Sequence, residues 1–514
     1  MKDTTDDLFD GNISRRKFIE RATAAGLTLA VLGDANENEV AAQIIKRTPA
    51  AKPVTPDWTR LQTKVKGRVV PLGGVDYESS RRAMVWNAVK PERFPDAIVR
   101  ISSEADVREA IRFARKNKLK VAIRGGGHHW HNSALRQGGL LLDLSGLNRL
   151  QVDAKHRTAV VQPGVTGATL MANLAPHGLA FPICHSPEVR MSGYLLNGGF
   201  GHNCGVWGPA CASVEAIEVV DARGESIRAD RNHNAEMFWA ARGAGPGFFG
   251  VVTRFHLKVF PLPRAILRSE LNYRIEDLDK VAAWLPQLAR SVPANVGWFV
   301  NCGGSGARAA SAGRLSIMAR AFADSASNAR EALGAFEAEP TGLKSLSKSL
   351  YQEAPFESVF GSSDAPDPEP EGPRFWCESV WSNASPQELL SSLRDRILAA
   401  PAVNPRVGAL LWFSHREDWP PQPDMALSMS ASTYVPVNAL SNDAAHDAGK
   451  RAWLSNTIAS LEPLTAGRYV GEADLTSAPD RAKQCFSPSA WDKLIRLKRK
   501  YDPDDMFFSY LQHA

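Results

Sequence analysis

A loop of three glycines followed by a histidine is the part of this chain best equipped for chemistry. The apolar run Val121–Ile123 leads into Arg124, Gly125, Gly126, Gly127 and His128. Glycines let backbone N–H groups approach a large ligand closely, and an imidazole is both a nucleophile and a proton carrier. The spacing therefore predicts a large, phosphate-bearing cofactor. The alternative is a glycine turn between two strands that carries a surface histidine.

Three further segments follow in order. Residues 192–201 (SGYLLNGGFG) form a second glycine loop, and residues 234–253 (NAEMFWAARGAGPGFFGVVT) predict a helix that runs into a glycine turn and a strand. Residues 491–507 (WDKLIRLKRKYDPDDMF) predict a closing helix with a Lys-x-x-Tyr-Asp-Pro tail. In this order the four segments resemble the berberine bridge enzyme-like branch of the vanillyl-alcohol oxidase superfamily. The resemblance runs from about Trp58 to the end of the chain.

This resemblance implies a PCMH-type FAD-binding domain and assigns its residues. Arg124–His128 match the family's Arg-x-Gly-Gly-His sequence, in which the histidine nitrogen bonds covalently to the flavin 8α-methyl group. His128 is therefore the expected anchor, whereas His129 and His131 are expected to be structural or surface residues. The full set of expected FAD contacts is Arg124, Gly125, Gly126, Gly127, His128, Ser133, Ser186, Val189, Ser192, Gly193, Gly198, Gly199, Gly201, Gly250, Val251 and Val252.

The second flavin anchor of the family is replaced in this chain. Relatives often carry Cys-Pro-Thr-Val-Gly before the second glycine loop, and here Ser186 stands in place of the cysteine. A serine oxygen does not replace that sulfur nucleophile, and Cys184 reaches the flavin only if the loop is shifted by two residues. We therefore expect a single histidyl bond. Val189 matches a small residue that leaves room for O2 and so favours an oxidase, unless it only packs in the core.

The family's catalytic tyrosines are also replaced. A base must take the proton from a substrate O–H or N–H, and relatives place it at the end of a Tyr-x-Asn-Tyr segment. Here that segment begins with Tyr469 and ends with Glu472, and Phe200 stands for a second family tyrosine. Glu472 and Tyr469 are the expected catalytic residues, with burial raising the pKa of Glu472 toward neutrality.

Other polar residues offer alternatives to this base. If Glu472 is a solvated surface carboxylate, the base has to be one of His202, His415 and Tyr434. Three serines, Ser428, Ser430 and Ser432, alternate along an expected strand at 427–435 and are expected to line the pocket with hydroxyl groups. Solvated serines on a strand would show the same pattern.

The N-terminus resembles a twin-arginine export signal. Arg15 and Arg16 precede Phe18 and a short, weakly apolar run at residues 22–33. The alternative is a basic amphipathic helix of the mature protein. We expect cleavage within residues 34–52 and export of the folded, flavin-loaded protein by the twin-arginine machinery to the periplasm or beyond.

Composition limits the remaining classes. The chain has 514 residues, 44% of them hydrophobic, and a formal net charge of +6 that is spread along the sequence. No basic run is interleaved with aromatic residues, so nucleic acid is not an expected partner. No apolar stretch reaches the roughly 18–20 residues of a membrane span. The six cysteines lack metal-ligand spacing, and folding before export favours reduced thiols over disulfides.

Helices and strands alternate between the glycine motifs, which predicts an α+β cofactor domain. A Ser-x-x-Asp opening at Ser103 and apolar residues at helical spacing predict a helix to Lys116. Strands are expected at 118–123, 140–144, 158–164, 216–221 and 251–260.

The pattern changes from Ala265 to about Tyr469. Strands such as 296–300 and 427–435 alternate with helices such as 443–461, which indicates a substrate domain with an antiparallel sheet backed by helices. The acidic, proline-rich residues 362–373 are expected to form a surface loop in it. The predicted parts are a signal and linker (1–52), a PCMH-type FAD-binding domain (53–264), a substrate-binding domain (265–475) and a C-terminal segment that returns to the FAD domain (476–514).

These features predict an exported FAD-linked oxidoreductase that acts on a small molecule. The expected reaction takes a hydride from a C–H beside a hydroxyl group of a sugar or an aromatic alcohol, with O2 as acceptor and hydrogen peroxide as product. One alternative is an amine or alkaloid substrate, and another is a dehydrogenase that uses a quinone or cytochrome. An alternative of a different class is a flavin-binding protein without turnover, because both family tyrosines are lost.

Overall fold

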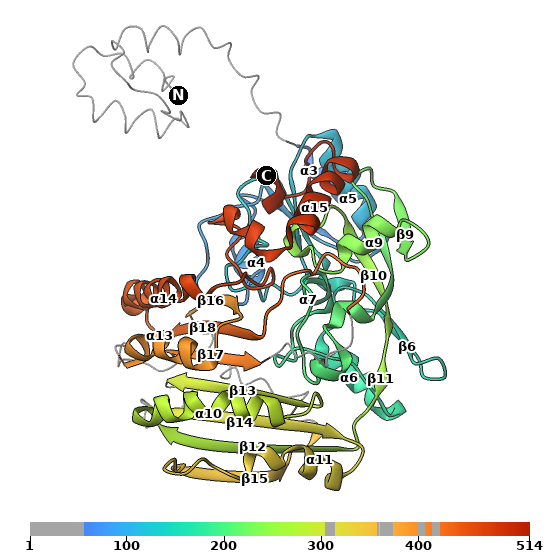
Figure 1. The fold of residues 1–514 in the computed structure, drawn as a ribbon. Coiled ribbons are helices and arrows are strands. Elements are labelled where there is room, and N and C mark those ends of the chain that lie inside the picture. Colours follow the sequence, from blue (N-terminus) through green and yellow to red (C-terminus); the bar gives the residue numbers. More distant parts are fainter. Residues whose placement is uncertain are drawn as a thin grey trace, which may run out of the picture. The chain divides into compact units, whose positions relative to one another are not determined.

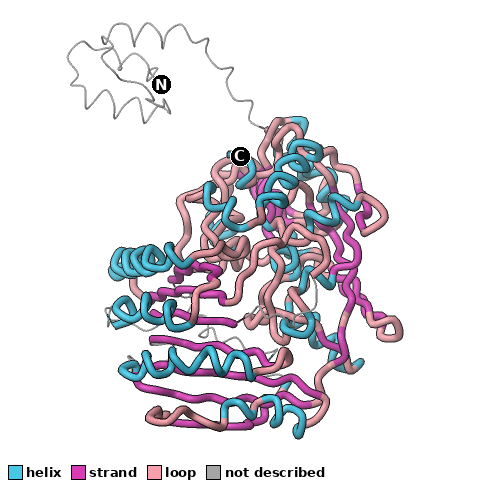
Figure 2. The backbone as a smooth tube through the Cα atoms, in the orientation of Figure 1, coloured by secondary structure: helices cyan, strands magenta, loops and turns pink. Residues whose placement is uncertain are grey.

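Three main β-sheets with helices packed against them make up the described part of the chain (Figures 1 and 2). The computed structural model describes residues 56–303, 314–356, 359, 374–398, 407–413 and 422–513. The expected export signal, the loop at 362–373 and His415 lie outside the described residues. The α+β class that the sequence predicts is confirmed, with all three sheets in one unit that begins at Trp58.

The first sheet has the order β1–β2–β4–β3 and carries the tri-glycine loop at the end of β3. Strands β2, β4 and β3 are parallel, and β1 is antiparallel to β2. Helix α5 begins after Ser103, whose hydroxyl accepts a hydrogen bond from the Asp106 N–H at 3.2 Å, as the sequence predicts. The bounds are β1 Arg68–Pro71, β2 Ala97–Arg100, β3 Val121–Arg124, β4 Leu140–Asp143, α3 Trp58–Gln62, α4 Tyr77–Ala83 and α5 Glu104–Lys116.

The second sheet is antiparallel, with the order β5–β6–β10–β8–β9. Its central strand β10 begins directly after Gly250. The bounds are β5 Leu150–Asp153, β6 Thr158–Val161, β8 Val214–Val220, β9 Ser226–Asp230 and β10 Val251–Lys258. Two short strands, β7 Leu179–Ala180 and β11 Phe260–Pro261, form a separate antiparallel pair, and β11 directly follows β10 in the chain. The accompanying helices are α6 Gly167–Leu174, α7 Met191–Leu196, α8 Cys204–Trp207 and α9 Ala235–Ala241.

The third sheet has seven strands in the order β15–β12–β14–β13–β17–β18–β16, all antiparallel. One face packs on helices in a single apolar cluster that includes Val435 and Val437, and Figure 1 shows α10, α13 and α14 along it. The strands are β12 Ala265–Arg274, β13 Val296–Gly303, β14 Arg314–Ala323, β15 Ser347–Glu353, β16 Arg374–Ser382, β17 Val407–Phe413 and β18 Thr433–Ser441. The helices are α10 Leu278–Ser291, α11 Ala326–Ala332, α13 Pro386–Leu398 and α14 Asp447–Leu461.

The C-terminal segment returns to the first sheet. After helix α15 (Pro488–Tyr501), Phe507 forms a parallel bridge with Val121 of β3. The Val121 N–H donates to the Met506 carbonyl at 2.8 Å, and the Phe508 N–H donates to the Val121 carbonyl at 2.9 Å. The chain therefore adds its last residues to the edge strand that carries the tri-glycine loop.

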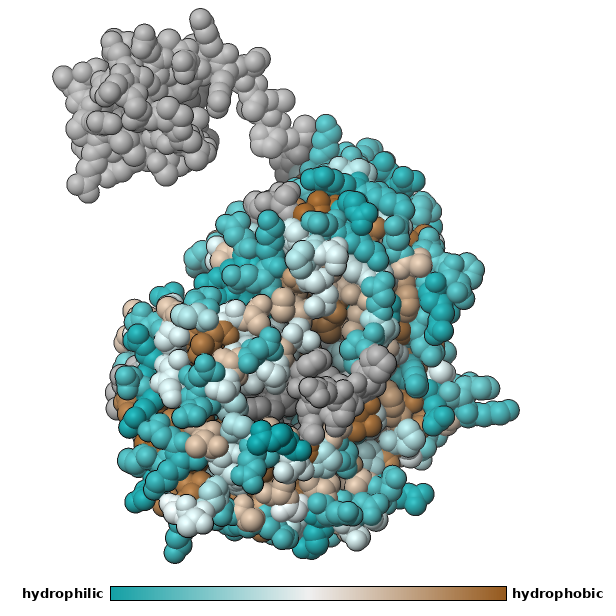
Figure 3. Space-filling model, in the orientation of Figure 1, coloured by the Kyte–Doolittle hydropathy of each residue, from teal (hydrophilic) through white to brown (hydrophobic). Residues whose placement is uncertain are grey.

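The strand expected at 427–435 is wrong over most of its length. Strand β18 begins at Thr433, because the preceding backbone pairs elsewhere: the Ala426 N–H donates to the Trp239 carbonyl at 3.2 Å and the Leu427 N–H to the Arg242 carbonyl at 2.9 Å. These residues are therefore hydrogen-bonded to the end of α9 and do not extend the sheet. Among the described residues, the well-exposed large apolar side chains are Leu72 and Val75 in the loop between β1 and α4, and Val206, Leu346 and Leu398 on other segments. Figure 3 shows hydrophobic residues in small groups among hydrophilic ones.

Candidate active site

A cavity of about 450 Å³ is lined by residues of all three sheets and of the C-terminal segment. Strand β3 and the loop after it contribute residues 121–130, Gly250 and Val252 lie at the start of β10, and β16 and β18 contribute alternate residues. Phe507 and Phe508 of the returning segment complete the lining. Segments about 390 residues apart in the chain therefore meet at one cavity, since Val121 and Phe508 both line it.

The tri-glycine loop is held tightly against its neighbours. A side chain at position 125 would collide with the Ser192 hydroxyl, and one at 127 with the Met84 carbonyl; Gly127 also has a φ of +73°. Arg124 fixes the loop from within, because its guanidinium donates to Asp143 at 2.9 Å and to the Gly126 carbonyl at 2.9 Å. The glycines at 125 and 127 are needed for packing within the protein as well as for access to a ligand.

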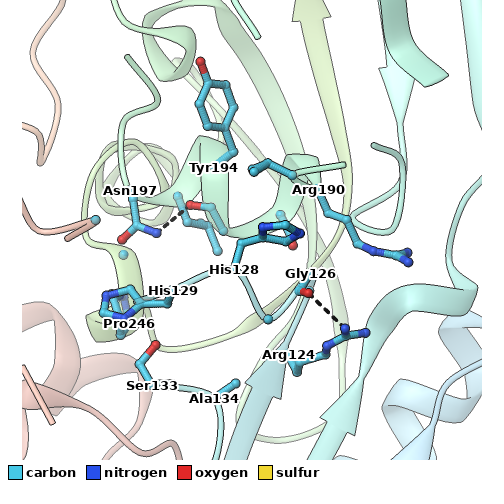
Figure 4. A pocket seen from close by; sticks show the side chains of 18 of the residues that line it. Arg124, Gly126, His128, His129, Ser133, Ala134, Arg190, Tyr194, Asn197 and Pro246 are labelled. Atoms are coloured by element: carbon cyan, nitrogen blue, oxygen red, sulfur yellow. Dashed lines mark hydrogen bonds between the residues drawn. The ribbon is translucent and has the colours of Figure 1, made fainter. Parts of the chain in front are cut away.

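His128 lies at the centre of the residues labelled in Figure 4, between the arginines and Asn197. Its ring stacks on Trp86, with centroids 5.7 Å apart. Burial, together with the positive charges of Arg124 and Arg190, lowers the pKa of His128 to about 4. The imidazole is therefore neutral at ordinary pH and keeps a lone pair, which is the form that a nucleophile needs.

The two neighbouring histidines differ from each other. His129 lines the cavity, its Nε2 atom has no hydrogen-bond partner within the described residues, and burial lowers its pKa to about 3. His131 does not line the cavity and lies 3.6 Å from Asp474 and 3.8 Å from Glu378. The structure thus places His129 on the cavity wall and His131 beside two carboxylates away from it.

Glu472 lies on the cavity wall, in a turn whose N–H groups at 472 and 473 donate back to the Tyr469 carbonyl at 3.1 and 3.0 Å. The Tyr434 hydroxyl donates to its Oε2 atom, and the Cys377 thiol lies 3.8 Å away. Burial raises the pKa of Glu472, while the donors Tyr434 and Trp130 oppose the shift. The structure therefore places this carboxylate at the cavity and not on the outer surface.

The remaining base candidates are placed differently. Tyr469 lines the cavity, but its hydroxyl accepts the Gly199 N–H at 3.2 Å, and burial raises its pKa. His202 does not line the cavity; burial and the nearby Arg320, at 3.4 Å, lower its pKa to about 3. Tyr434 lines the cavity as the partner of Glu472, and burial raises its pKa well above its ordinary value. His415 lies outside the described residues.

Comparisons with known proteins agree with this geometry. Residues 95–230 match the model of the family described as FAD binding domain. The chain is 30% identical over 437 residues to the FAD-linked oxidoreductase nodO of Hypoxylon pulicicidum, covering 83% of this chain and 93% of that one. The chain is a berberine bridge enzyme-like FAD-linked oxidoreductase. It is therefore a flavoenzyme of the vanillyl-alcohol oxidase superfamily.

Solved structures share the fold of this oxidoreductase. The crystal structure of 6-hydroxy-D-nicotine oxidase from Arthrobacter nicotinovorans superposes with a TM-score of 0.74 at 21% identity, covering 86% of this chain and 96% of that one. Berberine bridge enzyme-like protein 1 of Physcomitrella patens superposes with a TM-score of 0.75 at 17% identity, covering 88% and 98%.

The cavity residues fit an FAD molecule. Three buried polar atoms on its lining, Ser192 Oγ, Asn197 Oδ1 and His129 Nε2, have no partner among the described residues. A buried polar atom without a partner costs roughly 1–3 kcal/mol, which a ligand with both donors and acceptors recovers. Asn197 is already oriented, because its amide donates to the Gly193 carbonyl at 2.7 Å (Figure 4).

Most of the flavoenzyme's expected cofactor contacts line this cavity. They are Arg124, Gly125, Gly126, Gly127, His128, Ser133, Ser186, Val189, Ser192, Gly193, Gly250 and Val252.

Cys184 also lines the cavity, and its sulfur lies 3.7 Å from the His185 ring. Burial raises the pKa of this thiol, but the interactions with His185 outweigh burial and the net shift of the pKa is downward. All six cysteines are free thiols.

Four expected FAD contacts, Gly198, Gly199, Gly201 and Val251, and the three expected pocket serines are absent from the described cavity lining. Gly198 packs on Leu427, Gly199 and Gly201 pack on Tyr194, and the Val251 side chain is buried in the core of the first sheet.

The three serines, Ser428, Ser430 and Ser432, lie before β18 instead of along it, so they do not form the expected row of hydroxyls. Ser428 accepts the Ser487 N–H at 3.0 Å, and Ser432 donates to the Ser382 carbonyl at 3.2 Å.

The cavity also contains residues that the sequence patterns do not reveal. Trp130, Phe375, Cys377, Pro436 and Asn438 line it, four of them from β16 and β18. Alternation along these strands places residues 434, 436 and 438 on the cavity face and 435, 437 and 439 against the helices. The period-two pattern was the available signal, but it does not say which face of the strand lines the cavity.

Proposed function

We propose that this FAD-linked oxidoreductase is an oxidase of small molecules that carry a hydroxyl group, a sugar or an aromatic alcohol. The alcohol and O2 are converted to a carbonyl compound and hydrogen peroxide, so two hydrogens leave the substrate and both reach O2. Bound FAD supplies the acceptor for the hydride. The observation that carries the proposal is the Glu472 carboxylate on the cavity wall, with Tyr434 donating to it.

Glu472 acts as the base in this proposal. It takes the proton of the substrate hydroxyl as the adjacent C–H bond breaks, and its raised pKa makes it a stronger base than a solvated glutamate. The Tyr434 hydroxyl fixes one oxygen of the Glu472 carboxylate and so orients its second oxygen. Val189 on the cavity lining supports O2 as the acceptor.

An amine substrate is the second candidate, and the same carboxylate favours it. A buried carboxylate pairs well with an ammonium group and can also take its proton. A quinone- or cytochrome-linked dehydrogenase would share the cavity and differ only in slow reoxidation of its reduced flavin by air. The relatives are named oxidoreductases and oxidases, which supports an enzyme over a binding protein without turnover.

His128 is proposed as the single covalent attachment point of the flavin. Its neutral imidazole on the cavity lining supports this role. Ser186 also lines the cavity but offers no thiol, so no second bond is proposed there.

Replacing the proposed base tests the function. Glu472→Gln keeps the shape and removes the basicity, so flavin reduction by a good substrate should slow by about 10²- to 10⁴-fold in anaerobic stopped-flow measurements. Flavin content should stay unchanged. Glu236→Gln, at an exposed glutamate that pairs with Lys500, is the matched control and should reduce its flavin at the parent rate. Equal rates in Glu472→Gln and the parent would show that the carboxylate is structural.

We also propose that the enzyme is exported by the twin-arginine machinery to the periplasm or the extracellular space. The paired Arg15 and Arg16 before a short apolar run support this address. None of the helices in the described part of the chain is long and apolar enough to cross a membrane.

A further inference from the structure

The cavity wall around Glu472 is largely aromatic. Its carboxylate contacts Trp130, Tyr434 and Cys377, and these residues are joined to further rings. Trp130 and Phe375 stack with centroids 4.3 Å apart, and Tyr434 meets Tyr469 edge-on at 6.0 Å. A substrate that reaches Glu472 is therefore surrounded mainly by rings.

The polar groups of this wall are mostly engaged with one another. The Tyr434 hydroxyl donates to Glu472, the Tyr469 hydroxyl accepts the Gly199 N–H at 3.2 Å, and the Cys377 thiol lies 3.8 Å from Glu472. Asn438 is the one amide among the wall residues that β16 and β18 contribute. His185, which also lines the cavity and acts electrostatically on Glu472, adds one imidazole. With Asn438, this part of the described wall offers partners for one or two polar groups of a ligand.

This supply of partners separates two substrate classes. A sugar ring carries several hydroxyl groups, and each one buried without a partner weakens binding by roughly 5- to 150-fold. A planar aromatic body needs no such partners and gains from contact with other rings. Burial of an aromatic body also strengthens the interaction of its one polar group with Glu472, because water is excluded.

We infer that the substrate is a planar aromatic molecule with a single hydroxyl or amino group beside the C–H that is oxidised, and not a sugar. The inference rests on the proposed function and narrows its substrate class. The substrate loses one hydrogen as the proton that Glu472 takes and one with an electron pair. O2 is the oxidant that finally receives both as hydrogen peroxide, leaving an aldehyde, ketone or imine.

Binding and turnover are measured separately on the flavin-loaded enzyme. Phenol and gluconolactone serve as binding probes that follow the flavin difference spectrum, and benzyl alcohol, benzylamine, glucose and cellobiose serve as substrates for anaerobic flavin bleaching. Phenol should give a saturable difference spectrum and gluconolactone none at the same concentration. Benzyl alcohol or benzylamine should bleach the flavin at least tenfold faster than either sugar, and the better of the two identifies the group beside the C–H.

Two phenylalanine variants locate the aromatic contact. Phe375→Leu should raise the Kd of phenol by about three- to tenfold. Phe260→Leu is the matched control, because Phe260 is also half-buried and stacked on a tryptophan, Trp207 at 5.1 Å, but does not line the cavity. Its phenol Kd should equal that of the parent.

The outcomes separate the inference from the function on which it rests. Binding of gluconolactone but not phenol, faster bleaching by sugars, or an unchanged phenol Kd in Phe375→Leu would overturn the aromatic substrate class. Phenol binding that responds to Phe375→Leu without bleaching by any substrate would support that class and refute the proposed oxidation of small alcohols and amines.

Discussion

Burial drives His128 and Glu472, two groups on one cavity, toward their neutral forms. It lowers the pKa of His128 to about 4 and raises the pKa of Glu472. For the histidine this leaves a permanently available lone pair near neutral pH. For the glutamate it raises the pKa toward neutral pH, so the ionised form is a stronger base, and in the proposed function the same desolvation would serve a nucleophile and a base.

The histidyl bond is tested by acid precipitation. Parent protein should give a yellow pellet, because a covalent bond survives unfolding, and His128→Ala should release its flavin into the supernatant. His129→Ala is the control, since His129 also lines the cavity, and its pellet should stay yellow. A colourless parent pellet would remove the covalent assignment without affecting the fold.

Glu472 should give flavin reduction a single acid limb. Only the ionised carboxylate accepts a proton, so the rate should be full above its raised pKa and fall as the pH drops through it. Tyr434→Phe removes a donor that stabilises the ionised form, and a hydrogen bond to a charged group is worth about 1.5–3 kcal/mol, so the limb should move up by about one to two pH units. Tyr469→Phe, whose hydroxyl bonds to Gly199 instead, should leave the limb in place. Stopped-flow reduction from pH 4 to 9 measures both, and a limb that stays put in Tyr434→Phe would contradict the assignment.

Asp502, in the Tyr-Asp-Pro tail, organises the turn by which the C-terminal segment reaches the cavity. Its carboxylate accepts the Met506 N–H at 2.8 Å and the Phe507 N–H at 2.9 Å, and it pairs with Lys498; Asp502 is 2% and Lys498 5% exposed. The turn leads directly to Phe507 and Phe508 on the cavity lining. The Tyr-Asp-Pro motif, visible in the sequence only as a pattern, thus supplies a buried carboxylate that holds the turn leading to the cavity.

Removing the Asp502 carboxylate should lower the stability of the protein. Breaking one partner of a buried ion pair typically costs 3–5 kcal/mol, so Asp502→Asn should lower the free energy of unfolding by about that amount and reduce flavin content. Glu236→Gln removes the exposed pair with Lys500 on the same helix and should cost less than about 1 kcal/mol. Urea unfolding and flavin absorbance give the two readouts. Equal losses in the two variants would show that burial of the pair is unimportant.

Elements whose signals are local were predictable, and those that depend on distant partners were not. Helix α5 and strand β4 follow from capping and apolar spacing within a few residues. The segment before β18 has the alternation of a strand, but its backbone bonds to Trp239 and Arg242 at the end of α9, nearly 190 residues away. The same limit applies to the site: the tri-glycine loop and Glu472 have sequence motifs, whereas Phe375 and Trp130 become neighbours only through the sheet.

The cavity can form only when nearly the whole described chain has folded. Its lining runs from Val121 to Phe508, and the last residues bond to the first sheet. An export route that carries an unfolded chain would separate the protein from flavin made in the cytoplasm. A route that carries folded proteins allows loading first, which is the physical reason to connect the paired arginines with this flavoenzyme.

Replacing both arginines tests that connection. Arg15→Lys together with Arg16→Lys keeps the charge but removes the paired address, so flavin-loaded, active enzyme should accumulate in the cytoplasm while the parent is recovered from the periplasm. Arg47→Lys, a single arginine in the same predicted segment, is the control and should be exported like the parent. Fractionation followed by flavin fluorescence of each fraction measures the distribution. Equal periplasmic yield from the paired-lysine variant would refute the twin-arginine address and return the segment to an ordinary basic helix.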